Sequence, residues 1–572
     1  MTNTCCYNSF SFNNGETIEI NSNDVIVFVG SNNVGKSVAL KNIFISKHTL
    51  SENNLFSVIT NTKLTSDYSF VEFVTFLKSS EFCHEDSAGR VSFNIAQYSS
   101  LNEQQLFKQW EHMSLRNNLF RDVFFKFLDT KARLIGSNAV DTIDFVNQKA
   151  RVPLQKLYIN DQLEIIISSY FQQAFNLELI VSRLSGKKIH LHIGQTPSMA
   201  ENENILSTSY QSRIQKLPLL EAQGDGMRSF TSIILELFTQ NSSVVFIDEP
   251  EAFLHPPQAK LLGKLIGKEL TNKQIFLSTH SSDFIKGLLE SNKEDIKIIR
   301  IQRDGQKNIP SLLNNDDIKT LWKDPILRHS QIIDGVFHEN VFICESEGDC
   351  RFFSALLDSI FKDDPRSSRI SDTLFIASHG KQKIPTVVNA LKKLSVPTIS
   401  ICDFDIFNNE HPLKELVESH GGNWNDIEKR WRIFFKAINQ EKSQLNRAEV
   451  KDKIDAIFGK TNKNVLSLNE IDNVKEIIKQ SSPWSFAKAK GLAFVPQGEP
   501  YVACIDTIKM LNSIGIYPIK IGELESFDRS VSNSNKSKWL DEVLQKNMKT
   551  DTNLQQAREF VIEIVDKVFG SV

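Results

Sequence analysis

Two adjacent carboxylates, Asp248 and Glu249, follow the apolar run 244–247 and precede Pro250. An unbroken apolar run of this length is typical of a strand in a parallel sheet that is covered on both faces. Ligands bind at the carboxyl ends of such strands, and proline is well tolerated where a helix begins. The pattern therefore predicts a strand end that places one carboxylate beside a magnesium ion and a second beside a water molecule, as in a nucleotide hydrolase.

A second stretch with the chemistry of phosphate binding follows the apolar run 25–29. It matches GxxxxGK[ST], in which glycines form a tight turn, a lysine reaches the phosphates, and a hydroxyl ligates magnesium. Because the pattern lies between an apolar run and a helical one, it predicts a nucleotide-binding loop. The residues expected to contact the nucleotide or its magnesium ion are Gly30, Asn32, Asn33, Gly35, Lys36 and Ser37.

Two further segments carry candidate phosphate contacts. Gly224 and Gly226 lie at the predicted start of a helix, where glycines allow backbone amides to approach an anion. The segment 274–278, whose centre is apolar, predicts another buried strand, and His280 follows it. A single histidine is usually structural, but its position after the paired carboxylates predicts a contact with the γ-phosphate.

Taken in order, these segments resemble the ABC-type ATPases of the SMC/Rad50 kind over residues 1–300. The resemblance implies that Asp248 holds magnesium, that Glu249 polarises the attacking water, and that His280 senses the γ-phosphate. It also implies that Gly224 and Gly226 lie in the signature segment. That segment departs from the usual Leu-Ser-Gly-Gly, because it contains no serine.

A second set of carboxylates follows predicted strands in the other half of the chain. Glu345 follows the run 341–344, and Asp403 and Asp405 follow the run 398–402. Apolar runs that alternate with helical stretches predict a second parallel sheet. Divalent cations such as magnesium prefer oxygen ligands, and clustered carboxylates repel one another without a metal. The sequence therefore predicts a metal site at this sheet.

A strand-end glutamate followed by Asp-x-Asp is similar to the signature of Toprim domains. An ABC-type ATPase followed by Toprim resembles the OLD family (overcoming lysogenization defect) over nearly the whole chain. The resemblance implies an ATP-regulated, metal-dependent endonuclease that cuts DNA as a homodimer or higher oligomer. Its cofactors would be ATP with Mg²⁺ at the first site and two Mg²⁺ or Mn²⁺ ions at the second. Members often act in bacterial defence against phage, alone, beside a helicase-like partner, or beside a retron reverse transcriptase with its DNA.

The resemblance also assigns roles to residues of the second half. A lysine near the end of Toprim stabilises charge on the cleaved phosphate; Lys538 is the first choice here, and Lys536 is the alternative. The metal ligands that the resemblance implies are Glu345, Asp349, Asp403, Asp405 and Glu525.

The predicted fold is α/β in both halves, each with a helical insertion. Residues 492–495 and 516–521 are predicted to continue the second sheet after its insertion. The predicted segments are the ABC-type ATPase domain 1–310 with a dimerising helical insertion at about 101–175, the connector 311–335, and the Toprim domain 336–572 with a helical insertion at about 424–479.

Composition limits the remaining possibilities. A net charge of −3 excludes a generally basic nucleic-acid coat, so DNA binding needs a local groove or bridging metal ions. No apolar run approaches the roughly 20 residues that span a bilayer, and the N-terminus lacks the pattern of a signal peptide. Seven irregularly spaced cysteines favour reduced thiols. We therefore expect a cytoplasmic protein with no membrane association.

Two other classes of function stay open on the sequence. One is an SMC/Rad50-like DNA clamp whose ATPase drives closure without cleavage. The other is a Toprim primase or topoisomerase. A topoisomerase requires a tyrosine nucleophile, and the second half of the chain offers only Tyr501 and Tyr517, neither in a recognisable context.

Overall fold

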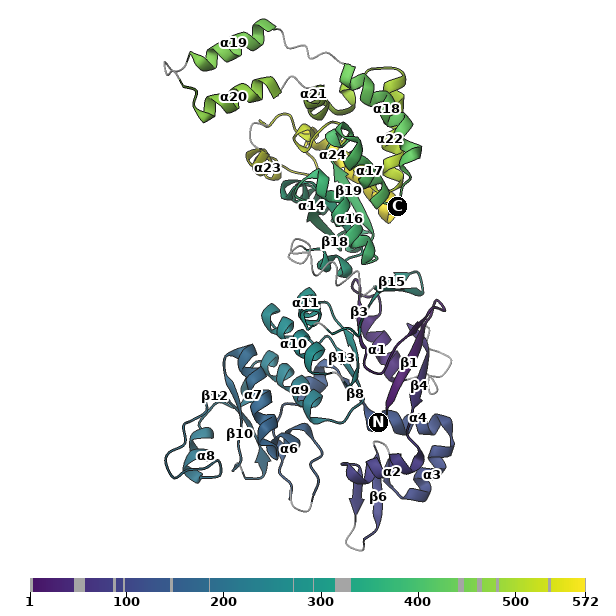
Figure 1. Ribbon diagram of the computed structural model, residues 1–572, viewed down its shortest axis with the longest axis vertical. Coiled ribbons are helices and arrows are strands. Elements are labelled where there is room, and N and C mark those ends of the chain that lie inside the picture. The colour runs from purple at the N-terminus through teal and green to yellow at the C-terminus, as the bar shows by residue number, and fades with distance from the viewer. Residues whose placement is uncertain are drawn as a thin grey trace. The chain divides into compact units, whose positions relative to one another are not determined.

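The computed structural model divides the chain into two compact units, Met1–Lys323 and Asp324–Val572 (Figure 1). Most of the predicted connector 311–335 lies outside the described residues. The residues that the structure describes are 4–45, 57–85, 89–95, 98–144, 148–184, 186–270, 272–291, 293–313, 331–440, 447–459, 465–479, 483–532 and 536–570.

The first unit is built on a six-stranded sheet in the order β16-β15-β3-β14-β13-β8. All neighbours are parallel except β16, which is antiparallel to β15. The predicted strands at 25–29, 244–247 and 274–278 are confirmed, and they are three adjacent interior strands of this sheet. The strands are β3 (Val25–Val29), β8 (Phe125–Leu128), β13 (Val244–Asp248), β14 (Gln274–Ser278), β15 (Ile296–Asp304) and β16 (Lys307–Leu313).

A three-stranded antiparallel sheet shares a core with one face of the six-stranded sheet. Its strands are β1 (Cys5–Phe12), β2 (Thr17–Glu19) and β4 (Ile59–Ser66). Helix α1 (Lys36–Ile45) contributes to the same core. Many of the abundant phenylalanines fill this core, as in the stacked rings of Phe246 and Phe276, whose centroids are 4.8 Å apart.

The stretch 101–175 is mainly helical but is not a single insertion, because β8 lies within it and pairs with β13. A four-residue strand flanked by helices leaves little period-two signal, so the helical spacing around it dominated the prediction. A dimerising role for this stretch stays a prediction. Its helices are α3 (Glu103–Glu111), α4 (Met113–Phe124), α5 (Thr130–Ile135), α6 (Pro153–Tyr158) and α7 (Asp161–Phe175).

The other elements of the first unit surround these sheets. The helices are α2 (Phe70–Ser79), α8 (Thr208–Ile214), α9 (Asp225–Thr239), α10 (Pro256–Glu269), α11 (Ser282–Glu290) and the 3₁₀ helix η1 (Leu220–Ala222). The strands are β5 (Cys83–Glu85), β6 (Val91–Ile95), β7 (Tyr98–Leu101), β9 (Val140–Asp141), β10 (Glu178–Val181), β11 (Lys188–Ile189) and β12 (Leu191–Gly194).

The second unit contains the predicted second parallel sheet, with four strands in the order β18-β17-β19-β20. Helices α14, α23 and α24 share a hydrophobic core with it. The strands are β17 (Asn340–Cys344), β18 (Thr373–Ala377), β19 (Thr398–Cys402) and β20 (Ile516–Pro518). The helices are α14 (Glu347–Phe361), α15 (Ser367–Ile370), α16 (Ile384–Lys393), α17 (Glu410–Ser419), α22 (Glu499–Ser513), α23 (Lys536–Leu544) and α24 (Gln555–Phe569).

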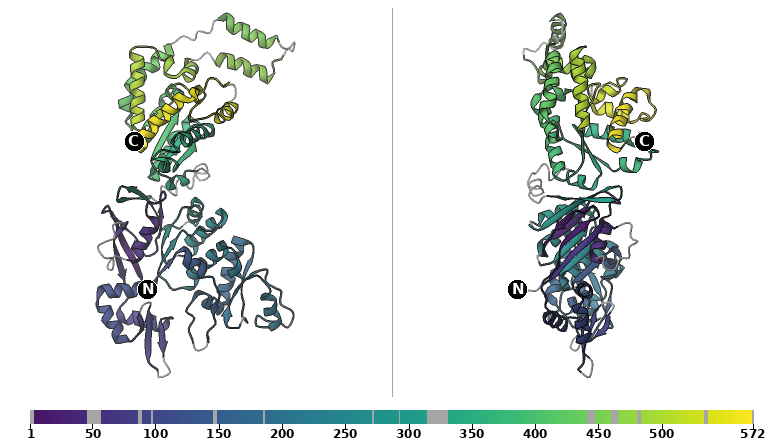
Figure 2. Two further views of the ribbon diagram at one scale, coloured as in Figure 1. Left: turned by 180° about the vertical axis from the view of Figure 1, so that it is seen from behind. Right: turned by 90° about the vertical axis from the view of Figure 1, so that its right-hand side faces the viewer.

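Between β19 and β20 the chain is helical, as predicted for 424–479. Helices α19 and α20 lie side by side and extend away from the sheet (Figure 1 and Figure 2). The predicted strand at 492–495 is wrong, because the structure has the 3₁₀ helix η5 (Gly491–Phe494) there. The helices are α18 (Trp424–Gln440), α19 (Arg447–Phe458), α20 (Leu468–Lys479) and α21 (Pro483–Lys490).

Short 3₁₀ turns complete the second unit. They are η2 (Ile333–Phe337), η3 (Lys381–Lys383), η4 (Phe404–Asn408), η6 (Leu524–Phe527) and η7 (Thr552–Leu554). The cysteines are all free thiols. Among the described residues, none of the helices combines the length and apolar character that crossing a membrane requires.

Candidate nucleotide and metal sites

The phosphate loop connects β3 to α1. Gly30 and Gly35 have φ values of 138° and 97°, which side chains with a Cβ rarely adopt. A Cβ on Gly30 would lie 2.4 Å from the carbonyl oxygen of Ile301, so the loop also needs glycine for space. Lys36 Nζ donates hydrogen bonds of 2.8 Å to the carbonyls of Gly30 and Ser31. Helix α1 begins at Lys36 and Ser37, and the amino end of a helix favours an anion.

The paired carboxylates lie at the same edge of the sheet as this loop. Asp248 ends β13 opposite Ser278 of β14, and the Ser278 hydroxyl donates to the Asp248 carboxylate. Glu249 Oε1 is 3.8 Å from His280 Nε2. The structure thus brings Glu249 and His280 together, as their predicted shared role at the γ-phosphate requires.

Glu251 is a residue of this site that the sequence reasoning did not assign. Its Oε1 accepts a 2.7 Å hydrogen bond from the backbone N–H of His280. Burial raises the pKa of Glu251, and its Oε2 has no hydrogen-bond partner among the described residues. Glu251 therefore fixes the backbone that carries His280.

Arg133 of α5 is a second residue that was missed. Its side chain is completely buried, and its guanidinium donates to the carbonyls of Asp248 and Glu249, the latter at 3.0 Å. Its Nε donates to Ser229 Oγ of α9 at 3.1 Å. Glu249 has a left-handed backbone, with φ of 50°, and such strain persists only where the surroundings enforce it. Arg133 therefore acts as a positioning residue for the Glu249 carboxylate.

Arg133→Lys is expected to lower kcat for ATP hydrolysis by about tenfold or more while leaving KM for ATP nearly unchanged. Lysine keeps the charge but lacks the planar fork that holds two carbonyls and Ser229 together. Steady-state hydrolysis tests this, with Lys131→Met, an exposed change on the same helix, as control. A wild-type kcat in Arg133→Lys would contradict the positioning role.

The two glycines of the predicted signature segment differ in environment. Gly224 precedes the first residue of α9, and a Cβ there would meet nothing within 4 Å. A Cβ on Gly226 would lie 2.5 Å from the carbonyl oxygen of Phe253, so packing alone requires glycine at this position. Contact of either glycine with a nucleotide stays a prediction.

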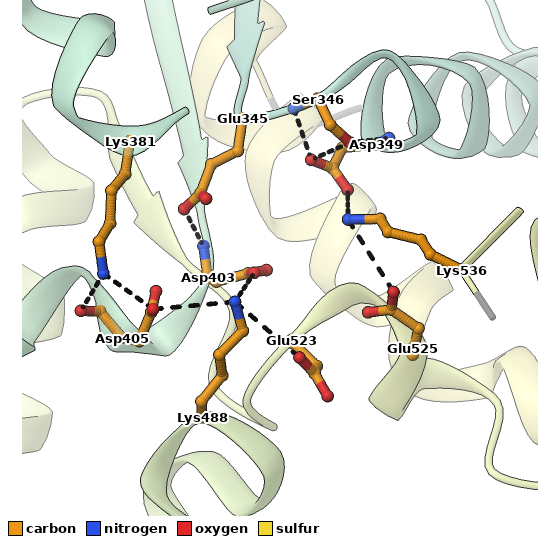
Figure 3. Close-up of polar contacts among 10 residues, drawn as sticks. All are labelled: Glu345, Ser346, Asp349, Lys381, Asp403, Asp405, Lys488, Glu523, Glu525 and Lys536. Atoms are coloured by element: carbon orange, nitrogen blue, oxygen red, sulfur yellow. Dashed lines mark hydrogen bonds and ion pairs between the residues drawn. The ribbon is translucent and has the colours of Figure 1, made fainter. Parts of the chain in front are cut away.

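In the second unit, three of the predicted metal ligands converge (Figure 3). Glu345 follows β17, and Asp403 and Asp405 follow β19; one oxygen of each lies within 4.8 Å of the others. The backbone N–H of Asp403 donates to Glu345 Oε1 at 3.2 Å. Burial and the neighbouring Asp403 and Asp405 raise the pKa of Glu345 to about 7, and burial raises the pKa of Asp403 to about 6.

The donor set fits a divalent cation. Asp405 Oδ1 is buried and has no hydrogen-bond partner among the described residues. An orphaned carboxylate oxygen beside two further carboxylates is costly by itself and is satisfied by a metal ion. Bound metal would also relieve the repulsion that raises these pKa values.

The other two predicted ligands form an adjoining group (Figure 3). Asp349 accepts from the backbone and hydroxyl of Ser346 at 2.8 and 3.0 Å, which caps α14 and fixes the carboxylate. Lys536 Nζ donates to Asp349 Oδ1 at 2.9 Å and lies 4.0 Å from Glu525 Oε1. Lys538 is exposed on the same helix, α23. The geometry therefore favours Lys536 over Lys538 as the lysine beside these acids, because residues two apart on a helix point to different sides; a catalytic role for it stays a prediction.

Lys488 and Lys381 also enter this site, and the sequence reasoning assigned neither. Lys488 Nζ of α21 lies 3.1 Å from Asp403 Oδ2, 3.7 Å from Asp405 Oδ2 and 4.0 Å from Glu523 Oε2. Burial alone would lower the pKa of Lys488, but these carboxylates raise it above its usual value. Lys381 Nζ donates to Asp405 Oδ2 at 2.8 Å. Lysine ammonium groups thus partly neutralise the cluster.

The metal-free protein is expected to become more stable as pH falls from about 7.5 to 5.5. Glu345, with a pKa of about 7, binds more protons folded than unfolded, so stability is lost as pH rises through that window. The loss should be on the order of 2 kcal/mol. Calorimetry with a chelator measures it, and Asp405→Asn should reduce the slope. A flat or inverted pH dependence would contradict the pKa shift.

Comparisons with known proteins agree with the first unit's geometry. Residues 25–285 match the family model "AAA domain, putative AbiEii toxin, Type IV TA system". The Old nuclease of Escherichia phage P2 is 24% identical over 195 residues, which are 32% of this chain and 32% of that protein. The chain thus matches about a third of the length of that relative.

Solved SMC heads also align with the chain, at low scores. The SmcHead bound to the C-winged helix domain of ScpA has a TM-score of 0.32 at 11% identity, covering 55% of this chain and 99% of that one. The SMC head domain from Thermotoga maritima has a TM-score of 0.26 at 9% identity, covering 55% and 100%. The family match, the phosphate loop and the Asp248-Glu249 pair support an ATPase domain that binds ATP. The family match ends at residue 285, before the second unit begins.

Proposed function

We propose that this protein is an ATP-regulated, divalent-metal-dependent endonuclease that cleaves DNA, with a Toprim domain as its second unit. The observation that carries the proposal is the convergence of Glu345, Asp403 and Asp405, with Asp405 Oδ1 buried and without a hydrogen-bond partner among the described residues. The similarity to the Old nuclease of phage P2 supports a nuclease rather than another metal enzyme.

The proposed site would hold two Mg²⁺ or Mn²⁺ ions, one at the cluster of Glu345, Asp403 and Asp405 and one toward Asp349 and Glu525. When bound, such ions supply an activated water and neutralise charge at the cleaved phosphate. The chain's own part is to aim the ligands. Ser346 orients Asp349, Lys381 orients Asp405, and Lys536 lies where its ammonium can donate to a phosphate oxygen beside Asp349.

We further propose that the ATPase acts in a homodimer or higher oligomer, because the resemblance to ABC-type ATPases implies that the signature segment, with Gly224 and Gly226, contacts the nucleotide of a partner subunit. The family resemblance supports a cytoplasmic role in defence against phage. A reverse transcriptase with its DNA, as in retrons, or a helicase would be a partner of that kind.

A Toprim topoisomerase is a less favoured interpretation than the proposed endonuclease. The ring of Tyr517 belongs to β20 and is 1% exposed, so its hydroxyl is a poor nucleophile for DNA. A primase would extend a strand, and an SMC-like clamp would hold DNA without cutting it.

The test incubates the full-length protein with supercoiled, linear duplex and single-stranded DNA, with ATP and with each of Mg²⁺, Mn²⁺, Ca²⁺ or a chelator. Cleavage is expected with Mg²⁺ or Mn²⁺ and not with the chelator, and Ca²⁺ should substitute poorly because its coordination is looser. Failure to cleave any DNA with any metal would favour the clamp. Covalent protein–DNA adducts or nucleotide incorporation would favour a topoisomerase or a primase.

A further inference from the structure

A pocket of ≈ 550 Å³ in the second unit lies outside the carboxylate cluster described above. Its lining includes three cationic side chains, and none of its lining residues is acidic. Hydroxyl, amide and aromatic groups complete it. The lining residues used below are Lys490, Tyr501, Lys520, Ser526, Arg529 and Asn553.

Two chain segments contribute to both the pocket and the carboxylate cluster. In α21, Lys488 contacts Asp403, whereas Lys490 lines the pocket. In η6, Glu525 lies 4.0 Å from Lys536, whereas Ser526 lines the pocket. The pocket and the carboxylates are therefore built on the same two segments of the chain.

Glycines hold these two segments in direct backbone contact. A Cβ on Gly491 would lie 2.2 Å from the carbonyl oxygen of Lys520, and a Cβ on Gly522 would lie 2.2 Å from that of Lys488. The N–H of Leu492 donates to the Lys520 carbonyl at 2.8 Å. No side-chain layer separates the segments at this point, so a ligand that fills the pocket contacts the same two packed segments that carry Lys488 and Glu525.

The charges of the pocket fit a polyanion. Lys520 pairs with Glu563 at 2.7 Å, but Lys490 and Arg529 have no acidic partner among the described residues. The protein as a whole carries a net charge of −3. The positive charge of this pocket is therefore not a general property of the protein surface. Lysine, arginine, hydroxyl and amide groups are the usual donors to phosphate oxygens.

The remaining lining suits a nucleotide more than a small inorganic ion. Tyr501 offers an aromatic ring, and aromatic rings stack on bases of any sequence in single strands. The hydroxyl of Ser526 and the amide of Asn553 add neutral polar groups.

We propose that this pocket binds the phosphate backbone of a single DNA strand beside the bond that the carboxylate cluster cleaves. The statement that the strand is the one being cut rests on the proposed nuclease function. The binding itself does not, because the pocket's cations and aromatic ring can hold DNA without cleavage. The pocket would offset the repulsion between DNA and the neighbouring carboxylates.

The experiment measures binding of the full-length protein to a fluorescein-labelled DNA strand of about 10 nucleotides. Calcium replaces magnesium so that cleavage is slow. Lys490→Glu combined with Arg529→Glu is expected to raise Kd at least about tenfold and to reduce the salt slope of log K by about 1.4, or 0.7 for each lost phosphate contact. Both positions are exposed, so folding should persist, and circular dichroism checks it.

Lys567→Glu is the control for a surface charge reversal, because it reverses one cation at an exposed position of α24. Its Kd should stay within about twofold of wild type. Photocrosslinking with 5-iododeoxyuridine in the same strand should label Tyr501. Three results would contradict the proposal that this pocket binds DNA. They are wild-type affinity in the double variant, an equal loss of affinity in Lys567→Glu, and crosslinks confined to residues other than Tyr501. If the wild type binds through the pocket but cuts no DNA with any metal, the pocket stands and the nuclease proposal falls.

Discussion

Asp403→Ala combined with Asp405→Ala is expected to lower DNA cleavage by at least about a thousandfold while ATP hydrolysis continues. In our proposal the two carboxylates hold the first of two metal ions, and without that ion the two-metal site can no longer activate water and offset charge on the phosphate together. The ATPase groups belong to the other unit of the chain. The metal-free double variant should also be more stable near pH 7.5, since Glu345 loses its repelling neighbours.

The measurement follows nicking and phosphate release in parallel for the wild type and the double variant. Asp541→Ala combined with Glu542→Ala is the matched control. It likewise removes two carboxylates from the second unit, but from exposed positions outside the cluster. That control should cleave DNA normally. Undiminished cleavage by the Asp403 and Asp405 double variant would show that this cluster is not the nuclease site.

Glu249→Gln is expected to reduce ATP turnover by about a hundredfold to ten-thousandfold while ATP still binds. The amide keeps the shape of the side chain, but it cannot polarise the attacking water as a carboxylate does. The left-handed backbone at Glu249 and its support by Arg133 should be unchanged, because both involve main-chain atoms.

Lys36→Ala gives the contrasting result. It removes the ammonium that lies over the phosphate loop, so nucleotide binding itself should weaken. Equilibrium binding and steady-state hydrolysis separate the two variants, with the exposed Glu201→Gln as control. Wild-type turnover in Glu249→Gln would disprove its role.

Much of the fold follows from local sequence. The runs 25–29, 244–247 and 341–344 are short, unbroken and apolar, and each lies in a strand buried in a parallel sheet. Because such strands share one carboxyl edge, the acids that follow β17 and β19 had to be near one another. Sequence order alone was therefore enough to predict that Glu345, Asp403 and Asp405 belong to one group.

The features that were missed depend on contacts between distant segments. Arg133 is buried against carbonyls of β13, and Lys488 reaches the acids from α21; neither lies in a pattern that marks its partner. Lys536 and Lys538 are equivalent in the sequence, and only the orientation of α23 separates them. The run 492–495 is apolar enough for a strand, but Gly491, with φ of 60° and the Lys520 backbone against it, ends any extended pairing.

The position of β8 limits how far the first unit can be shortened. A truncation that removes 101–175 as though it were an appendage would delete the edge strand paired to β13 and, with it, Arg133. Residues 125–135 therefore have to be retained, and so does α4, because its buried residues Leu119, Phe120, Val123 and Phe124 belong to the core beneath the sheet. A minimal ATPase module made from this chain should keep β8 and α5 joined to β13.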